Sequence, residues 1–136
     1  MNLEKNITNS IIRAINNLPG HMASKRLSNG ATSSKGYPDI TGVIELQIQP
    51  KGRPESLQLG VRLEIEVKQP GKKPTKIQYA RLRSFRRLNC IAFWTDSKID
   101  AMNKLVFWTK VLSGKINHPG DQDLNPSKTS KTSFLF

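Results

Sequence analysis

Between positions 3 and 18, apolar residues recur at three- and four-residue steps, the spacing of one face of a helix. A proline and a glycine at positions 19 and 20 are expected to end that helix. Residues 20–38 are polar and predict a long loop. Residues 39–49 and 57–68 alternate apolar with polar side chains, as strands with one buried face do. The turn between them is rich in proline and glycine, which predicts an antiparallel hairpin.

The second half of the chain predicts two helices and a short strand. Thr75 is a suitable N-cap for a helix that runs to about Leu88. Residues 90–95 are an apolar run of strand length. Ser97 is placed to cap a helix over 98–112, although the second half of that segment fits a strand equally well. This order of elements predicts an α/β or α+β domain, with a mixed β-sheet, an antiparallel hairpin and flanking helices.

The composition suggests one folded domain over residues 1–112. Residues 113–136 are rich in lysine, serine, asparagine and proline, which predicts a polar tail or arm, disordered or at a subunit interface. No apolar run approaches the roughly 18 residues of a membrane span, and the first residues lack the pattern of a secretory signal. We therefore expect a cytoplasmic protein that binds no membrane. One cysteine and two histidines exclude an internal disulfide and a cysteine–histidine zinc site within one chain.

The charge of the chain points to a polyanionic partner. There are 22 lysines and arginines against 10 aspartates and glutamates, a formal net charge of +12. Like charges repel, so a compact domain gains no stability from this excess, and nucleic acid is the expected partner. No acid lies between Glu66 and Asp96, which favours phosphate contacts over ion pairs for the basic residues there. The candidate nucleic-acid-binding residues are Lys25, Arg26, Lys35, Tyr37, Lys72, Lys73, Lys76 and Arg81. Within this set the tyrosine could stack on a base or pack against the strand.

The predicted hairpin brings candidate catalytic residues together. Asp39 starts its first strand and Glu66 lies near the end of the second, so antiparallel pairing places the two carboxylates close to each other. They would repel without a cation, and oxygen ligands suit Mg²⁺ or Mn²⁺. The main-chain carbonyl of Val67 is a further candidate ligand. Lys68 shares a face with Glu66 and could act on an attacking water or on a transition-state phosphate.

A simpler interpretation competes with this one. Glu66 and Lys68 could belong to a solvated strand face and form only cross-strand ion pairs. Glu64 has the same parity, and a salt bridge to an arginine or lysine is the role expected for it. Glu45 is expected on the surface.

Three motifs occur in order: Gly36-Tyr37-Pro38-Asp39, then Glu66-Val67-Lys68, then Gln78. This ordered set resembles the PD-(D/E)XK nuclease superfamily, and in particular its VRR-Nuc branch, which includes phage-type nucleases similar to Holliday junction resolvases. The resemblance covers about residues 36–78 and extends to about residue 100. It implies a restriction-endonuclease-like core in which the metal ligands are Asp39, Glu66 and, from the first helix, Glu4. It also implies that Lys68 is the catalytic lysine and that Gln78 holds the attacking water or a phosphate.

The function implied by the resemblance is a Mg²⁺- or Mn²⁺-dependent DNA endonuclease that selects branched DNA, in an intracellular protein of phage or prokaryote type. No nucleotide cofactor is expected. Cutting two strands requires two sites, which suggests a homodimer. Two alternatives remain open: a sequence-specific homing or restriction-type endonuclease of the same superfamily, and a basic nucleic-acid-binding module without catalysis.

Overall fold

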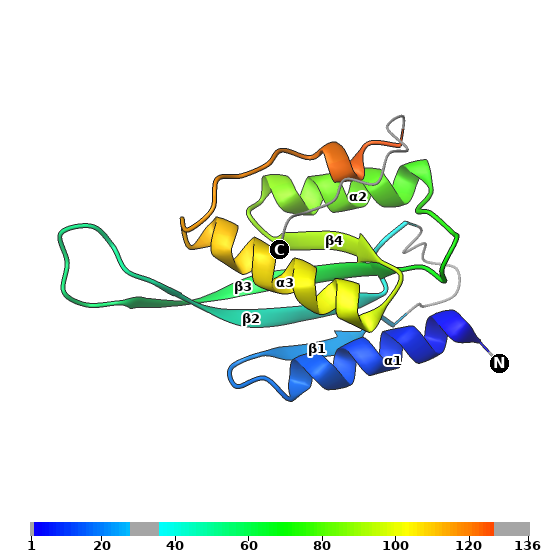
Figure 1. Cartoon of the computed structure of the whole chain (residues 1–136), viewed down its shortest axis with the longest axis horizontal. Coiled ribbons are helices and arrows are strands. Elements are labelled where there is room, and N and C mark those ends of the chain that lie inside the picture. Colours follow the sequence, from blue (N-terminus) through cyan, green and yellow to red (C-terminus); the bar gives the residue numbers. More distant parts are fainter. Residues whose placement is uncertain (1, 28–35, 127–136) are drawn as a thin grey trace.

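A computed structural model describes residues 2–27 and 36–126 and shows one four-stranded sheet with helices on both faces (Figure 1). The elements in chain order are α1 (Leu3–Asn16), β1 (Met22–Lys25), β2 (Ile40–Ile48), β3 (Leu57–Val67), α2 (Lys76–Arg87), β4 (Ile91–Thr95), α3 (Lys98–Leu112) and the short 3₁₀ helix η1 (Gln122–Leu124). The strand order is β1-β2-β3-β4. The expected α+β class, with a mixed sheet and flanking helices, is confirmed.

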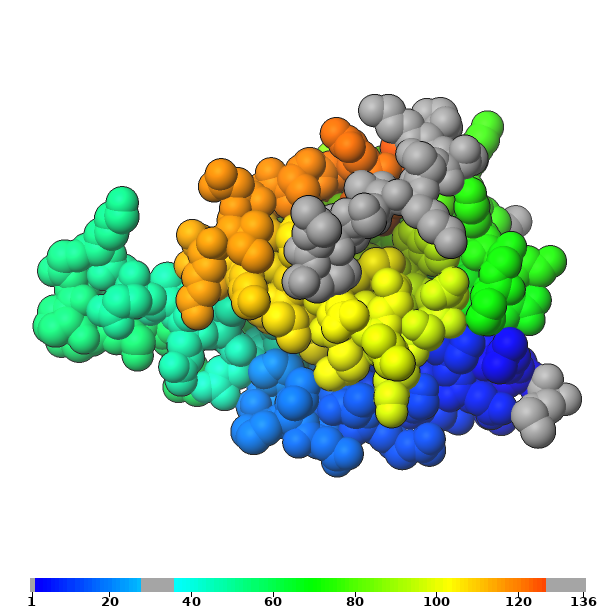
Figure 2. Space-filling view, viewed as in Figure 1, coloured from blue at the N-terminus to red at the C-terminus, as the bar shows by residue number. Residues whose placement is uncertain are grey.

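The predicted hairpin is present, and its register is continuous. β2 pairs antiparallel with β3 from Ile40 opposite Ile65 to Ile48 opposite Leu57. The hairpin extends beyond the helices, and its tip stands out from the body of the molecule (Figure 2). β3 then pairs parallel with β4, so α2 forms the crossover between them.

Strand β1 was not expected, because its residues fall in the segment predicted to be a loop. It has only four residues, of which Ala23 alone is buried, so it lacks a periodic signal. The side chain of Asn16, at the end of α1, stabilises it. The Asn16 Oδ1 accepts from the Ala23 N–H at 2.8 Å, and the Asn16 Nδ2 donates to the Ala23 carbonyl at 3.0 Å. Gly42 opposite Ala23 permits the close pairing, since a Cβ there would lie 2.3 Å from the Met22 carbonyl oxygen.

The helix starts follow the predicted caps. Thr75 and Gln78 form a capping box at the start of α2. Ser97 caps α3 by accepting from the N–H of Asp100 at 3.1 Å. α3 is helical to Leu112, which removes the strand alternative for its second half. Its buried residues recur at helical spacing and pack against the sheet, so tertiary packing decides between the two.

Each face of the sheet has its own core. The larger one joins α1 and α3 to the sheet and includes Ile11, Ile15, Ile65, Phe93, Leu105 and Trp108. The smaller one lies under α2 and contains Tyr79, Leu82, Ala92 and Leu124. Glu64 and Glu66 point to the face that carries α2, and both are buried there. The interpretation of this face as a solvated one is therefore wrong.

The segment after α3 packs onto α2, so the folded unit continues past the boundary expected at residue 112. Leu124 is fully buried, and its carbonyl accepts from Arg83 Nη1 at 2.6 Å. Arg86, also buried, pairs with Asp123 at 2.7 Å and with Asp121 at 3.3 Å. These acids are absent from the sequence around α2 and reach it only through the fold.

Positively charged side chains also cover the outer edge of β4. The Ala92 carbonyl accepts from Arg86 Nε and Nη2 at 3.0 and 2.7 Å. The Trp94 carbonyl accepts from Lys104 Nζ at 2.7 Å. No helix in the part of the chain that the structure describes has the length and apolar character needed to cross a membrane.

The buried position of Arg86 predicts a structural role. Replacing it with methionine should lower the free energy of unfolding by about 3–5 kcal/mol, because Asp123 and the Ala92 carbonyl lose a buried charged partner. Urea unfolding measures this loss. The matched variant Arg87→Met, at an exposed position of the same helix turn, should change stability by no more than about 0.5 kcal/mol. Equal stability of the two variants would contradict a structural role for Arg86.

Candidate active site

Three of the predicted catalytic residues, Asp39, Glu66 and Lys68, meet where β2 begins and β3 ends. Asp39 directly precedes β2, and the pairing of Ile40 with Ile65 places it beside Glu66. The Asp39 Oδ2 accepts from the N–H of Val67 at 2.9 Å. Its main-chain carbonyl accepts from the N–H of Arg26 at 2.7 Å. The Asp39 carboxylate is thus held by the end of β3, and its main chain by the residue that follows β1.

Glu66 forms a coupled pair with Asp39. Its side chain is only 2% exposed. Burial, a hydrogen bond with the Asp39 side chain and the charge of Asp39 raise the pKa of Glu66 from 4.5 to about 10, while Lys68 lowers that pKa and Glu4 raises it. At neutral pH Glu66 therefore holds a proton and donates it to Asp39. Its Oε1 is buried and has no hydrogen-bond partner among the described residues.

Lys68 lies next to this pair, as predicted. Its Nζ is 3.9 Å from the Glu66 Oε2, and the side chain is 15% exposed. Its main-chain N–H donates to the Thr95 carbonyl at 2.9 Å, which ties the residue to the end of β4. The ammonium group is therefore held beside the carboxyl pair and keeps access to solvent.

Glu4 and Gln78 lie in the first turns of two helices. Glu4 is in the first turn of α1 and is close enough to raise the pKa of Glu66. Gln78 is in the first turn of α2, where its Oε1 accepts from the Thr75 N–H at 2.8 Å. The carbonyl of this amide is thus engaged in the capping box. Only its nitrogen, with two N–H donors, remains for the predicted contact with water or phosphate.

The pair suits a hard divalent cation. In the described part of the chain, no three side chains of the His, Cys, Asp or Glu type form a ready metal cluster. Two adjacent carboxyl groups, one with an orphaned buried oxygen, nevertheless fit Mg²⁺ or Mn²⁺, which take oxygen ligands and retain several waters. Asp39 and Glu66 would be the principal ligands. The contact that Val67 makes here is through its N–H, and the ligand role expected for its carbonyl stays a prediction.

The predicted nucleic-acid-binding residues fall into two groups. Lys25, Lys72, Lys73 and Lys76 are exposed, whereas Arg26, Tyr37 and Arg81 form a stack. The guanidinium carbons of the two arginines lie 5.4 and 4.3 Å from the centroid of the tyrosine ring. Of the two roles left open for this tyrosine, the structure shows packing within the protein. Lys35 lies outside the described residues.

A second buried carboxylate, Glu64, organises arginines on the same sheet face. It forms ion pairs with Arg26 and with Arg62, the second at 3.5 Å, which confirms the salt bridge expected for it. Arg62 is not among the residues expected from the sequence to bind nucleic acid. The alternation of Arg62, Glu64 and Glu66 along one face of β3 could have identified it.

Comparison with protein-family models, curated proteins and solved structures finds no match for this chain. The interpretation of the site therefore depends on the geometry of Asp39, Glu66 and Lys68.

The raised pKa of Glu66 predicts a pH-dependent stability. The folded state keeps this proton between pH 4.5 and about pH 10, while the unfolded chain loses it, so stability should fall as pH rises through that range. The slope is at most about 1.4 kcal/mol per pH unit. Glu66→Gln removes this contribution, because the amide donates to Asp39 at every pH. In EDTA the variant should therefore be more stable than the wild type at pH 8 and nearly equal to it at pH 4.5.

Chemical denaturation across this pH range measures the difference. Glu55→Gln, at an exposed position in the hairpin turn, is the matched control and should follow the wild-type profile. Parallel profiles for Glu66→Gln and the wild type would show that Glu66 is not held protonated.

Proposed function

We propose that this protein is a metal-dependent endonuclease that hydrolyses phosphodiester bonds in DNA. The observation that supports it best is the coupled pair of Asp39 and Glu66, with an orphaned buried oxygen and the Lys68 ammonium 3.9 Å from Glu66. A structural ion pair alone needs neither the second carboxylate nor the unpaired oxygen. The net charge of +12 supplies the affinity for a polyanion.

In the proposed mechanism, Asp39, Glu66, Lys68 and Val67 have separate roles. Asp39 and Glu66 would hold the ion, with Glu66 binding it as a carboxylate, so metal affinity should rise with pH. Bound Mg²⁺ or Mn²⁺ supplies a Lewis acid for the phosphodiester and lowers the pKa of a coordinated water. Lys68 places a positive charge where negative charge develops on the phosphate. The N–H of Val67 keeps Asp39 oriented throughout.

Positive charge also surrounds the approach to the site. Lys72 and Lys73 lie in the loop before α2, and Lys76 is its first residue. The N-terminus of this helix adds the positive end of its dipole. Phosphate groups approaching the end of β3 therefore meet a positive potential before they reach the carboxyl pair.

The sequence resemblance extends the proposal to a restriction-endonuclease-like core and to branched DNA, such as a four-way junction. A homodimer would present one site to each of two strands. The described part of the chain fits this proposal, with a mixed sheet covered by helices on both faces.

A cleavage assay tests the function. Labelled four-way junction, flap, linear duplex and single strand are each incubated with Mg²⁺, Mn²⁺ or EDTA, using the wild type and Asp39→Asn. We expect metal-dependent cutting of the branched substrates that Asp39→Asn loses. Discrete cuts on linear duplex alone would replace the junction proposal with a sequence-specific endonuclease. Binding without cutting under every metal would leave a non-catalytic binding module.

Lys68 should act on the chemical step. We expect Lys68→Ala to lower the single-turnover rate by about 10²–10³-fold, the loss typical of one preorganised electrostatic group, and to leave DNA affinity in EDTA within about twofold of the wild type. Lys110→Ala, which removes an exposed lysine in the last turn of α3, is the matched control and should retain the wild-type rate. Substantial residual cutting by Lys68→Ala would remove this residue from the mechanism.

A further inference from the structure

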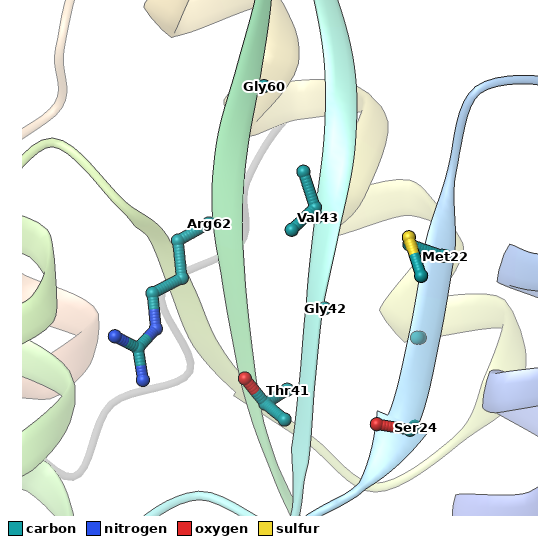
Figure 3. Close-up of a pocket in the computed structure, with 8 residues that line it drawn as sticks. Met22, Ser24, Thr41, Gly42, Val43, Gly60 and Arg62 are labelled. Carbon is teal, nitrogen blue, oxygen red and sulfur yellow. The ribbon is translucent and has the colours of Figure 1, made fainter.

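A groove of about 440 Å³ lies on the face of the sheet that carries α2, over the strands that α2 leaves uncovered (Figure 3). It is lined by residues of β1, β2 and β3 and by none from α2. The lining side chains include Met22, Ser24, Thr41, Val43 and Arg62, and Gly60 contributes bare backbone. The proposed catalytic roles use none of these residues.

The strand register connects the groove to the carboxyl pair. Ser24, Thr41 and Glu64 form one row across the sheet, and Met22, Val43 and Arg62 form the next. These rows share the face of Glu66, which lies two residues beyond Glu64 on β3. Two residues of a strand span about 7 Å, so the groove begins about 7 Å from the carboxyl pair and continues away from it.

A cluster with more positive than negative charge lies beside the groove. Arg26 and Arg62 pair with the carboxylate of Glu64, and Arg26 and Arg81 both stack on the ring of Tyr37. Arginine does not lose its proton in proteins, so this excess persists at every relevant pH. The Nε of Arg81 is buried and has no hydrogen-bond partner within the described residues.

Arg62 is the member of this cluster that reaches the groove. Its side chain is 51% exposed, and its only ion pair with a described residue is the long contact to Glu64 at 3.5 Å. Its guanidinium lies 4.9 Å from the centroid of the Phe85 ring on α2, which holds it in place. Figure 3 shows the side chain leaving β3 at the margin of the groove, toward the side of α2. Most of its N–H donors therefore stay available for a phosphate.

We propose that this groove holds a single, unpaired DNA strand next to the cleaved bond, with Arg62 binding one of its phosphates. The identification of this strand as DNA rests on the proposed function. The hydroxyls of Ser24 and Thr41 suit phosphate oxygens, and the missing side chain at Gly60 lets the strand approach the sheet. A volume of this size is that of a small-ligand site, which suits one nucleotide unit of a single strand better than a duplex.

Binding in EDTA tests the groove without cleavage. The probes are a short fluorescein-labelled oligothymidylate, a duplex of similar length, a nucleoside monophosphate and inorganic phosphate. Arg62→Gln removes the phosphate contact. Gly60→Val fills the groove without changing its charge, and its Cβ would lie 3.3 Å from the Val43 Cγ1, a contact that a small shift relieves. Arg87→Gln removes the same charge from an exposed position that does not line the groove.

We expect Arg62→Gln to weaken binding of the oligothymidylate by about tenfold, the effect of one lost charged contact. Gly60→Val should weaken it by about the same factor, because the added side chain occupies the space of the strand. Arg87→Gln should weaken it by less than about twofold, and Arg62→Gln should lower the slope of log K against log salt by about 0.7, the value for one single-strand phosphate. Duplex affinity should change little in Gly60→Val. Equal losses for Arg62→Gln and Arg87→Gln, or unchanged binding by Gly60→Val, would overturn the proposal. Binding of the nucleoside monophosphate and of inorganic phosphate as tight as that of the oligothymidylate would also overturn it.

These outcomes are separable from failure of the proposed function. If the wild type cuts DNA with Mg²⁺ and the groove variants bind and cut normally, the groove proposal fails and the endonuclease stands. If the wild type cuts nothing while the groove variants lose oligonucleotide binding, the groove stands as a single-strand site and the endonuclease fails. Thermal unfolding of each variant confirms that it is folded.

Discussion

The parallel pairing of β3 with β4 is the constraint on which the rest of the structure depends. Parallel neighbours need a crossover, and α2 supplies it by running across one face of the sheet. That face carries Glu64 and Glu66, so the crossover removes two carboxyl groups from water. Burial of such groups is costly unless each finds a partner, and the partners that they find define the two polar clusters of the molecule.

The two carboxyl groups are stabilised in different ways. Glu64 stays paired with Arg62 of β3 and with Arg26, which directly follows β1. Glu66 meets another acid, Asp39, and keeps a proton, which leaves one of its oxygens without a partner in the described structure. Glu64 and Glu66, two residues apart on one strand, therefore have different surroundings. The first organises a surface that suits phosphate, and the second offers a site that suits a cation.

Much of this arrangement follows from the sequence, and some of it does not. The alternation over residues 57–68 and the cap at Thr75 predict β3 and α2, and the hairpin register brings Asp39 to Glu66. The burial of Glu66 is not predictable in this way, because the alternation is the same whether water or a crossover helix covers the polar face. The partners of Arg86 lie about 35 residues later in the chain, beyond the reach of any local pattern.

The coverage of both outer strands decides how copies of this protein can meet. Asn16 occupies the outward N–H and carbonyl of Ala23 on β1, while Arg86 and Lys104 occupy carbonyls of β4. Unpaired sheet edges can pair with strands of other molecules, so these side chains block strand addition at these positions. Strand addition at these positions is blocked, so a symmetric pair of molecules would need another surface, such as the helices or the protruding hairpin. In such a pair, the two copies of the Asp39–Glu66 carboxyl pair would belong to separate sheets, and their spacing would not be fixed by strand pairing.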